Sequence, residues 1–327
     1  MSGGFLAVDS GGSGLRVVVG TAGADGRGPL GTRASREPVR TGPRGIEPGH
    51  LMDQLLPMVR ALTTESRVDR FATVVVGAAG LATLGDALRA ELPDALAREL
   101  GARKVALVAD AVTAYVGALG PRPGAVVAAG TGLIATGTDL ARWHRADGWG
   151  HLLGDCGGGA WIGRAGLEAA LRAHDGREGG SAPLLARARE RFGPAAGIPG
   201  QLYPRTDRPA VLASFAPDVA ACAPGDPVAA EILRAAARHM ADSAAAVCPR
   251  DGEPRLAVTG GLLKLGDPLV VPLDEELAKR LPQARRTAAE GDPLDGSVRI
   301  ATDLATGTLT LPGDDAMLWV TTVAEGR

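Results

Sequence analysis

Hydrophobic and polar positions along this 327-residue chain form short apolar runs that alternate with longer stretches of helical periodicity. The first two runs, Phe5–Val8 and Leu15–Val19, flank a glycine-rich turn and predict a β-hairpin. A third strand is expected over Gly31–Pro38, and leucines at helical spacing predict a helix from Ile46 to about Thr64. This alternation is typical of an α/β protein.

The same alternation continues to the end of the chain. Strands are expected over residues 71–76, 104–108, 125–129, 133–137 and 255–259. Helices are expected over residues 83–100, through Tyr115 to Leu119, 158–174, 182–192, 208–222, 226–247, from Leu262, and 292–306. Both halves open with strand, glycine turn and strand, which indicates an internal duplication. Because Pro121 and Pro123 end a helix, we place the lobe boundary there: an N-terminal lobe of residues 1–120 and a C-terminal lobe of residues 121–327.

Composition narrows the class of protein. Apolar residues make up 45% of the chain, which supports a substantial core, and the length predicts about two domains. The net charge of −2 offers no basic excess for nucleic acid or an anionic membrane. No apolar run approaches the roughly 18 residues of a membrane span, the N-terminus lacks the signal-peptide pattern, and three scattered cysteines form no disulfide framework. A cytoplasmic location is therefore expected.

The turn of the first hairpin contains the first candidate functional residues. Its sequence runs Asp9-Ser10-Gly11-Gly12-Ser13-Gly14, and backbone N–H groups of Gly11, Gly12 and Ser13 can close on an anion. Asp9 stands where a carboxylate would face a phosphate-bound Mg²⁺, directly or through water. The turn leads into a strand and not a helix, which disfavours a Rossmann site, and the chain has no P-loop motif. This arrangement predicts an ATP-handling enzyme.

Two further positions extend this prediction. Asp110 follows a hydrophobic strand, where ligands gather in open α/β sheets; it is either a general base or the N-cap of the next helix, and the two roles are compatible. Gly130, Thr131 and Gly132 form either a second phosphate loop or an ordinary hairpin turn. Their place at the start of the second half favours the phosphate loop.

Residues Gly148 to Gly163 form the motif with the most candidate functional residues: several glycines, two tryptophans and an acid lie just before or at the start of a predicted helix. Sugars bind through carboxylates and flat apolar faces, chemistry that Asp155 and Trp149 can supply; the alternative for both tryptophans is core packing, which we prefer for Trp161. We interpret His151 as a structural loop residue, and the spacing of nearby His and Cys residues fits no standard zinc site.

Another small-residue turn follows the strand that ends at Thr259. Gly260 and Gly261 would let a flat adenine lie against the backbone, although a tight strand–helix turn explains them equally well.

Taken in order, these motifs resemble the sugar kinase/actin/Hsp70 ATPase superfamily and, within it, the BadF/BadG family, most closely its N-acetylglucosamine kinases. The segment Gly148–Gly163 is similar to the G-W-G-x-x-x-G-D-E-G-S-x-x-W-I run of those kinases. The resemblance implies two actin-like, ribonuclease H-like lobes around an interdomain cleft, with residues 292–306 returning to the N-terminal lobe. It also implies ATP and Mg²⁺ as cofactors, a homodimer, and phosphorylation of a hexosamine, foremost N-acetylglucosamine to its 6-phosphate.

Carried over by position, the resemblance assigns roles to individual residues. Asp110 would be the base and touch the sugar, while Ser13 and Thr131 would contact ATP. The sugar pocket would be lined by Gly148, Trp149, Gly150 and Asp155.

Three departures from the family pattern leave the identity of the sugar substrate undecided. Cys156 stands where the family usually has Glu, Ser10 replaces a usual glycine, and residues 41–45 offer no Asn to a sugar. Glucosamine kinase is therefore an alternative activity, and so is a BadF-type ATPase activator coupled to a partner redox protein. A non-catalytic sugar sensor is disfavoured, because the chain retains Asp9, Asp110 and Thr131, and a sensor need not keep a base.

Overall fold

The computed structural model describes residues 3–11, 14–23, 28–68 and 70–323. The chain divides into two compact units. Unit 1 comprises Met1–Pro123, Thr138–Trp143 and Thr287–Arg327, and unit 2 comprises Gly124–Gly137 and His144–Arg286. The first boundary thus falls in the Pro121–Gly124 segment. Unit 1 includes Thr287–Arg327, whereas the family resemblance implies the return of residues 292–306 only.

Unit 1 is built on a six-stranded sheet in the order β13-β7-β6-β1-β2-β3. Strands β1, β6 and β7 are parallel to one another, and β2, β3 and β13 pair antiparallel to their neighbours. Their bounds are β1 Gly3–Gly11, β2 Gly14–Ala22, β3 Pro29–Ser35, β6 Phe71–Ala78, β7 Lys104–Ala109 and β13 Leu318–Thr322. A two-residue ladder, β4 Thr41–Gly42 with β5 Gly45–Ile46, lies in the segment expected to be a loop.

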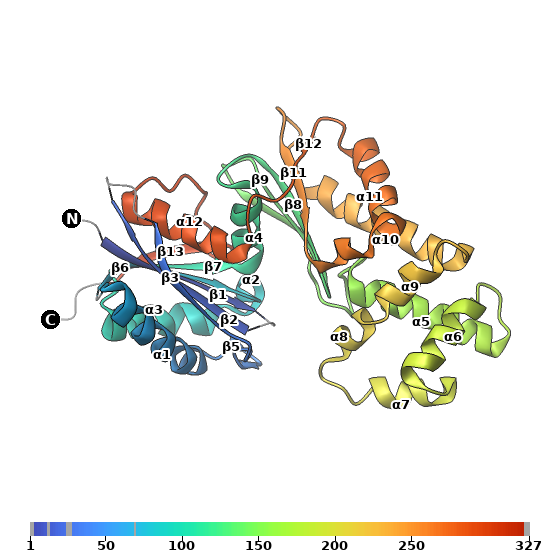
Figure 1. Ribbon diagram of the computed structural model, residues 1–327. Helices are drawn as coiled ribbons and strands as arrows, with labels where there is room; N and C mark the ends of the chain where they lie inside the picture. The colour runs from blue at the N-terminus through green and yellow to red at the C-terminus, as the bar shows by residue number, and fades with distance from the viewer. Residues whose placement is uncertain (1–2, 12–13, 24–27, 69, 324–327) are drawn as a thin grey trace. The chain divides into compact units, whose positions relative to one another are not determined.

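Helices cover both faces of this sheet (Figure 1). The helices are α1 Pro48–Ser66, α2 Leu81–Leu84, α3 Asp86–Leu100, α4 Asp110–Leu119 and α12 Pro293–Thr306. Leu6 and Val8 of β1 belong to the same buried cluster as the leucines of α1 and α3. Each such side chain stabilises the unit by about 1.5–3 kcal/mol.

Helix α12 covers the other face together with α4 (Figure 1). Asp292 caps it by accepting the backbone N–H groups of Leu294 and Asp295, Pro293 presets its first turn, and Gly307 ends it in the left-handed region. Ser297 donates its hydroxyl to the Val8 carbonyl of β1 at 3.1 Å. The predicted helix over residues 292–306 is confirmed.

Unit 2 contains a five-stranded sheet in the order β10-β9-β8-β11-β12, in which β8, β11 and β12 are parallel. The strands are β8 Gly124–Ala129, β9 Leu133–Thr138, β10 Trp143–Asp147, β11 Arg255–Thr259 and β12 Arg285–Arg286. The helices are α5 Gly159–Asp175, α6 Ala182–Phe192, α7 Ile198–Leu202, α8 Arg208–Ala213, α9 Ala216–Cys222, α10 Pro227–Val247 and α11 Asp267–Arg280, with 3₁₀ turns at Ala195–Gly197 and Gly261–Leu265. Alanine and leucine side chains of α5, α10 and α11 form the buried core against the sheet.

Several predicted elements need correction. The helix expected over 208–222 is two helices, α8 and α9, because Pro217 lacks the N–H that would continue the first. The helix expected from Leu262 is a 3₁₀ turn, and α11 begins only at Asp267. The third strand is Pro29–Ser35, not residues 31–38. Strands β10 and β13 were not predicted.

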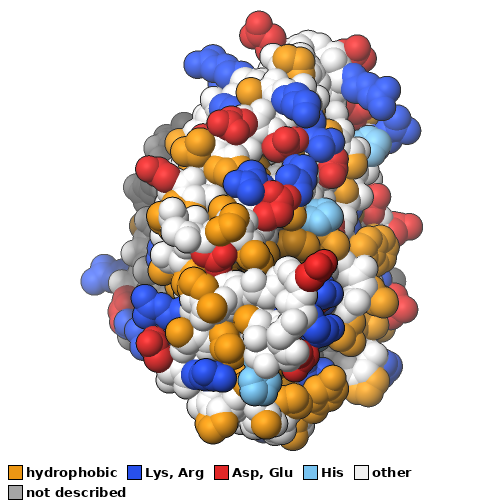
Figure 2. All heavy atoms as spheres, turned by 90° about the vertical axis from the view of Figure 1, so that its right-hand side faces the viewer, with side chains coloured by type: hydrophobic (Ala, Val, Ile, Leu, Met, Phe, Trp, Pro, Cys, Tyr) orange, Lys and Arg blue, Asp and Glu red, His pale blue; other side chains and the backbone are white. Residues whose placement is uncertain are grey.

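The surface agrees with the low net charge. Acidic and basic side chains are interspersed over the face in Figure 2. Within the part of the chain that the structure describes, no helix combines the length and apolar character needed to cross a membrane.

Candidate functional site

The carboxyl ends of three parallel strands bring Asp9 and Asp110 to one edge of the unit 1 sheet. In the strand register, Ser10 of β1 lies beside Ala78 of β6, which lies beside Ala109 of β7. With strands about 4.8 Å apart, Ser10 and Ala109 are separated by roughly 10 Å. Asp9 precedes the first of these residues and Asp110 follows the second, so both predicted acids belong to the edge where ligands bind in open sheets.

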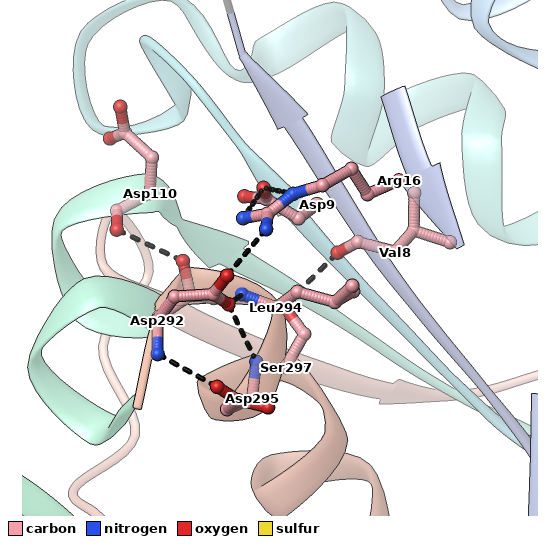
Figure 3. A network of polar contacts seen from close by, with 9 residues as sticks. Val8, Asp9, Arg16, Asp110, Asp292, Leu294, Asp295 and Ser297 are labelled. Carbon is pink, nitrogen blue, oxygen red and sulfur yellow. Dashed lines mark hydrogen bonds and ion pairs between the residues drawn. The ribbon is translucent and has the colours of Figure 1, made fainter. Parts of the chain in front are cut away.

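Asp110 presents its side chain to solvent. It is the first residue of α4, and Ala109 is the N-cap, so the interpretation of Asp110 as the cap is wrong. Its Oδ1 accepts the N–H of Ala111 at 2.9 Å, and the residue is exposed. Figure 3 shows its carboxylate pointing away from the neighbouring ion pairs of Arg16. An exposed carboxylate at a strand end can take a proton from an alcohol.

Asp9 is held by an arginine that the sequence pattern did not single out. Arg16 lies directly opposite Asp9 in the β1–β2 hairpin and donates to its Oδ2 from Nε at 3.0 Å and Nη2 at 2.7 Å. Through Nη1 it also reaches Oδ2 of Asp292, the cap of α12, at 2.5 Å. Arg16 therefore joins the hairpin to the N-terminus of α12, as Figure 3 shows.

This bridge shifts the pKa values of its members. Burial alone would raise the pKa of Asp292, but hydrogen bonds from Arg16 and from backbone N–H groups lower it below its ordinary value. Burial alone would lower the pKa of Arg16, but its bonds to Asp292 and Asp9 raise it. The carboxylate and the guanidinium thus stabilise each other in their charged forms.

The surroundings of Asp9 fit a magnesium ligand. Both nitrogens of Arg16 bind Oδ2, so Oδ1 lies outside these bonds, and a carboxylate oxygen is the donor that Mg²⁺ prefers. Of the predicted phosphate loop, Gly11 pairs with Gly14 at the hairpin tip, whereas Gly12 and Ser13 lie outside the described residues. Gly14 has φ +128°, and a Cβ there would overlap the Ser35 carbonyl, so only glycine fits.

In unit 2, two of the predicted glycine motifs meet at one sheet edge. Thr259 of β11 lies beside Ala128 of β8, so the turns after both strands are neighbours. Gly260 has φ +103°, and a Cβ there would overlap the Ala129 carbonyl, immediately before Gly130. The predicted adenosine motif and the predicted second phosphate loop are therefore adjacent.

Asp155 lies against the second of these turns. A Cβ on Gly132 would overlap Oδ2 of Asp155, so the missing side chain makes room for the carboxylate. Gly159 donates its N–H to the Gly130 carbonyl at 2.9 Å, and Ala160 donates to the Thr131 carbonyl at 2.8 Å. These contacts fix the first turn of α5 and the acid before it against residues 130–132.

The rest of the predicted sugar motif forms a loop between β10 and α5. Gly150 donates its N–H to Oδ1 of Asp155 at 3.0 Å, and Gly148 and Gly150 have positive φ values of 73° and 83°. Trp149 is 63% exposed, which contradicts core packing, and the guanidinium of Arg145 lies 4.5 Å from its ring centre. Trp161 packs against the buried core and edge-on to His239, as expected.

The electrostatics of this loop centre on Asp155. Burial raises its pKa, the Gly150 N–H lowers it, and the nearby charge of Asp147 raises it again; the outcome lies above the ordinary value. Burial and the charges of Asp147 and Asp155 also raise the pKa of Cys156.

Comparisons with known proteins find similarity to this chain in both sequence and fold. Residues 7–293 match the model of the BadF/BadG/BcrA/BcrD ATPase family. A curated relative, the N-acetylmuramic acid/N-acetylglucosamine kinase of Clostridium acetobutylicum, is 41% identical over 75 residues, which span 23% of this chain and 24% of that protein's length.

Many solved structures share the fold. A protein described as a candidate N-acetylglucosamine kinase from Chromobacterium violaceum superposes with a TM-score of 0.70 at 25% identity, covering 90% of this chain and 97% of that one. A ROK family glucokinase from Streptomyces griseus, solved with glucose and AMPPNP, gives a TM-score of 0.51 at 22% identity, covering 93% of this chain and 100% of that one.

Proposed function

The chain belongs to the BadF/BadG/BcrA/BcrD ATPase family, and we propose that it transfers the γ-phosphoryl group of ATP to a hexosamine, with N-acetylglucosamine as substrate and O6 as acceptor. The observation that carries this proposal is the exposed Asp110 carboxylate at the same sheet edge as Asp9. A sugar hydroxyl needs a base to become a nucleophile, and an ATP-binding acid alone does not provide one.

In the proposed reaction, Asp110 accepts the proton of the attacking hydroxyl as the new O–P bond forms and the bond to ADP breaks. Phosphoryl transfer depends on positioning and charge neutralisation more than on covalent chemistry. The backbone N–H groups of Gly11, Gly12 and Ser13 and of Thr131 and Gly132 would hold the phosphates. The Gly130 N–H donates instead to the Gly132 carbonyl at 3.0 Å and closes the turn. Mg²⁺, held near Asp9 when bound, would neutralise phosphate charge.

Unit 2 would supply the sugar contacts. Asp155 would accept hydrogen bonds from sugar hydroxyls beside residues 130–132, and the exposed ring of Trp149 would offer an apolar face, with Gly148 and Gly150 permitting close approach. Gly260 and Gly261 would lie against adenine. The name of the clostridial relative supports an acetamido sugar as the substrate class. We also propose that the protein is cytoplasmic and acts as a homodimer.

A coupled ADP-release assay tests this proposal. The purified protein is mixed with MgATP and a panel of N-acetylglucosamine, N-acetylmuramic acid, N-acetylmannosamine, glucosamine and glucose. The proposal predicts ADP release stimulated most by N-acetylglucosamine, and phosphorus NMR of the product should show a 6-phosphate ester. ADP release that no sugar stimulates would reject the kinase and favour an ATPase that acts on a partner protein; preference for glucosamine would replace the substrate only.

A further inference from the structure

The carboxylate of Asp147 binds the backbone of the loop between β10 and α5, which carries the predicted sugar motif. Its Oδ1 accepts the N–H of Asp155 at 2.5 Å, and its Oδ2 accepts the N–H of Cys156 at 2.8 Å. A Cβ on Gly154 would overlap Oδ1 of Asp147, so the glycine lets the carboxylate approach the chain. One side chain at the end of β10 thus binds two consecutive amides on the far side of the loop.

Those two bonds lie at a residue whose backbone conformation is uncommon. Asp155 has φ +54°, in the left-handed region that side chains other than those of Gly, Asn and Asp rarely adopt. Residues persist in this region when surrounding structure fixes them there. Asp147 itself has φ +60°, and Arg145 donates to its carbonyl at 3.1 Å and to the Gly148 carbonyl at 2.7 Å. Arg145 therefore holds the backbone on both sides of the Asp147–Gly148 peptide in place.

The position of the Asp155 carboxylate depends directly on this backbone. Its two oxygens lie between the Gly150 N–H and the surface of Gly132. A rotation about the Asp155 φ would move the carboxylate away from both. We propose that Asp147 is a positioning residue for Asp155, fixing the carboxylate that binds the sugar; this inference rests on the proposed function.

The chemistry favours aspartate over its amide at position 147. Each carboxylate oxygen accepts one N–H, and ionised acceptors form the stronger hydrogen bonds. Asparagine has only one acceptor oxygen, so its NH₂ group would face an N–H donor. The negative charge of Asp147 also acts on Asp155, together with burial and the opposing charges of His151 and Arg145.

The test compares Asp147→Asn with a matched control, Asp139→Asn. Asp139 lies in the turn at the other end of the β9–β10 hairpin, where its Oδ1 alone accepts the N–H groups of Ala141 and Arg142. Asparagine retains that single acceptor, so the same chemical change breaks contacts at one site and not at the other. The readouts are hydrogen exchange of the Asp155 and Cys156 amides, the titration of the Asp155 carboxyl followed by carbon NMR, and the KM values for sugar and ATP.

We expect Asp147→Asn to speed exchange of both amides at least tenfold, to lower the pKa of Asp155, and to raise the sugar KM about tenfold with the ATP KM unchanged. Loss of one hydrogen bond to a charged group has about this effect. In an Asp155→Asn background the same substitution should change the sugar KM less than twofold, because Asp147 acts through Asp155. Asp139→Asn should change none of these quantities.

Unchanged exchange at both amides would overturn the inference, as would independent, multiplicative effects of the two substitutions on the sugar KM. If the wild-type protein phosphorylates no sugar, the proposed function fails, and amide exchange and the Asp155 titration still decide whether Asp147 positions that carboxylate.

Discussion

Replacing Arg16 by glutamine tests the bridge between the first hairpin and α12. The substitution removes two hydrogen bonds to Asp9, whose side chain is 16% exposed, and one to Asp292, whose side chain is 51% exposed. Exposed ion pairs contribute about 0.2–1 kcal/mol, whereas breaking a buried pair costs about 3–5 kcal/mol. Because this bridge is partly buried, we expect the free energy of unfolding to fall by about 1–3 kcal/mol.

Urea unfolding followed by circular dichroism measures this loss. The control is Arg33→Gln, which removes an ion pair to Glu65 whose two side chains are 46% and 55% exposed, and should cost less than about 1 kcal/mol. Equal stability of the two variants would show that the bridge contributes no more than a surface ion pair.

The pH dependence gives a second check on the same bridge. The pKa of Asp292 is lowered in the folded protein, so its contribution to stability is present above the ordinary value of 3.8 and is lost as the pH falls through the folded-state value. The stability difference between wild type and Arg16→Gln should therefore shrink below about pH 3.8. A difference that stays constant into acid would show that the ion pair to Asp292 is not its source.

Two more predictions concern packing and reactivity. Gly296→Ala should lower the free energy of unfolding by about 1–3 kcal/mol, because the added Cβ would overlap the Thr113 carbonyl where α12 meets α4. The measurement is the Tm, and an unchanged Tm would show that the two helices can move apart at no cost. Cys248 is 6% exposed and burial raises its pKa to about 11, whereas Cys156 and Cys222 are half-buried. At pH 8, mass spectrometry should therefore find a thiol reagent on Cys156 and Cys222 first, and early labelling of Cys248 would contradict its burial.

Elements with strong local signals could be predicted from the sequence. The helix over residues 292–306 has an Asp-Pro start and a glycine end, and its structure follows those signals. Strand β13 has only five residues and depends on pairing with β7, more than 200 residues earlier in the chain, so no local pattern reveals it. Strand β10 reads Trp-His-Arg-Ala-Asp, too polar for a strand prediction, and is specified by its place at the sheet edge.

The site residues also divide into those with a local sequence signal and those that depend on tertiary structure. Asp9, Asp110 and Gly132 stand at strand ends, which the sequence can place. Arg16 faces Asp9 only once the hairpin register is formed, and Asp292 joins them from the far end of the chain. Asp147 lies beside Asp155 only because glycines with positive φ turn the loop back on itself. Such partnerships depend on tertiary structure that no motif encodes.

The turnover number of Asp110→Asn, with MgATP and the best sugar of the panel, tests whether Asp110 is the general base. We expect kcat to fall by about 10²–10⁴-fold with a modest change in the sugar KM, the usual scale for loss of a general base. Asp94→Asn, an exposed acid on α3, should leave kcat unchanged. If Asp110→Asn phosphorylates sugar at the wild-type rate, Asp110 is not the base that activates the sugar hydroxyl.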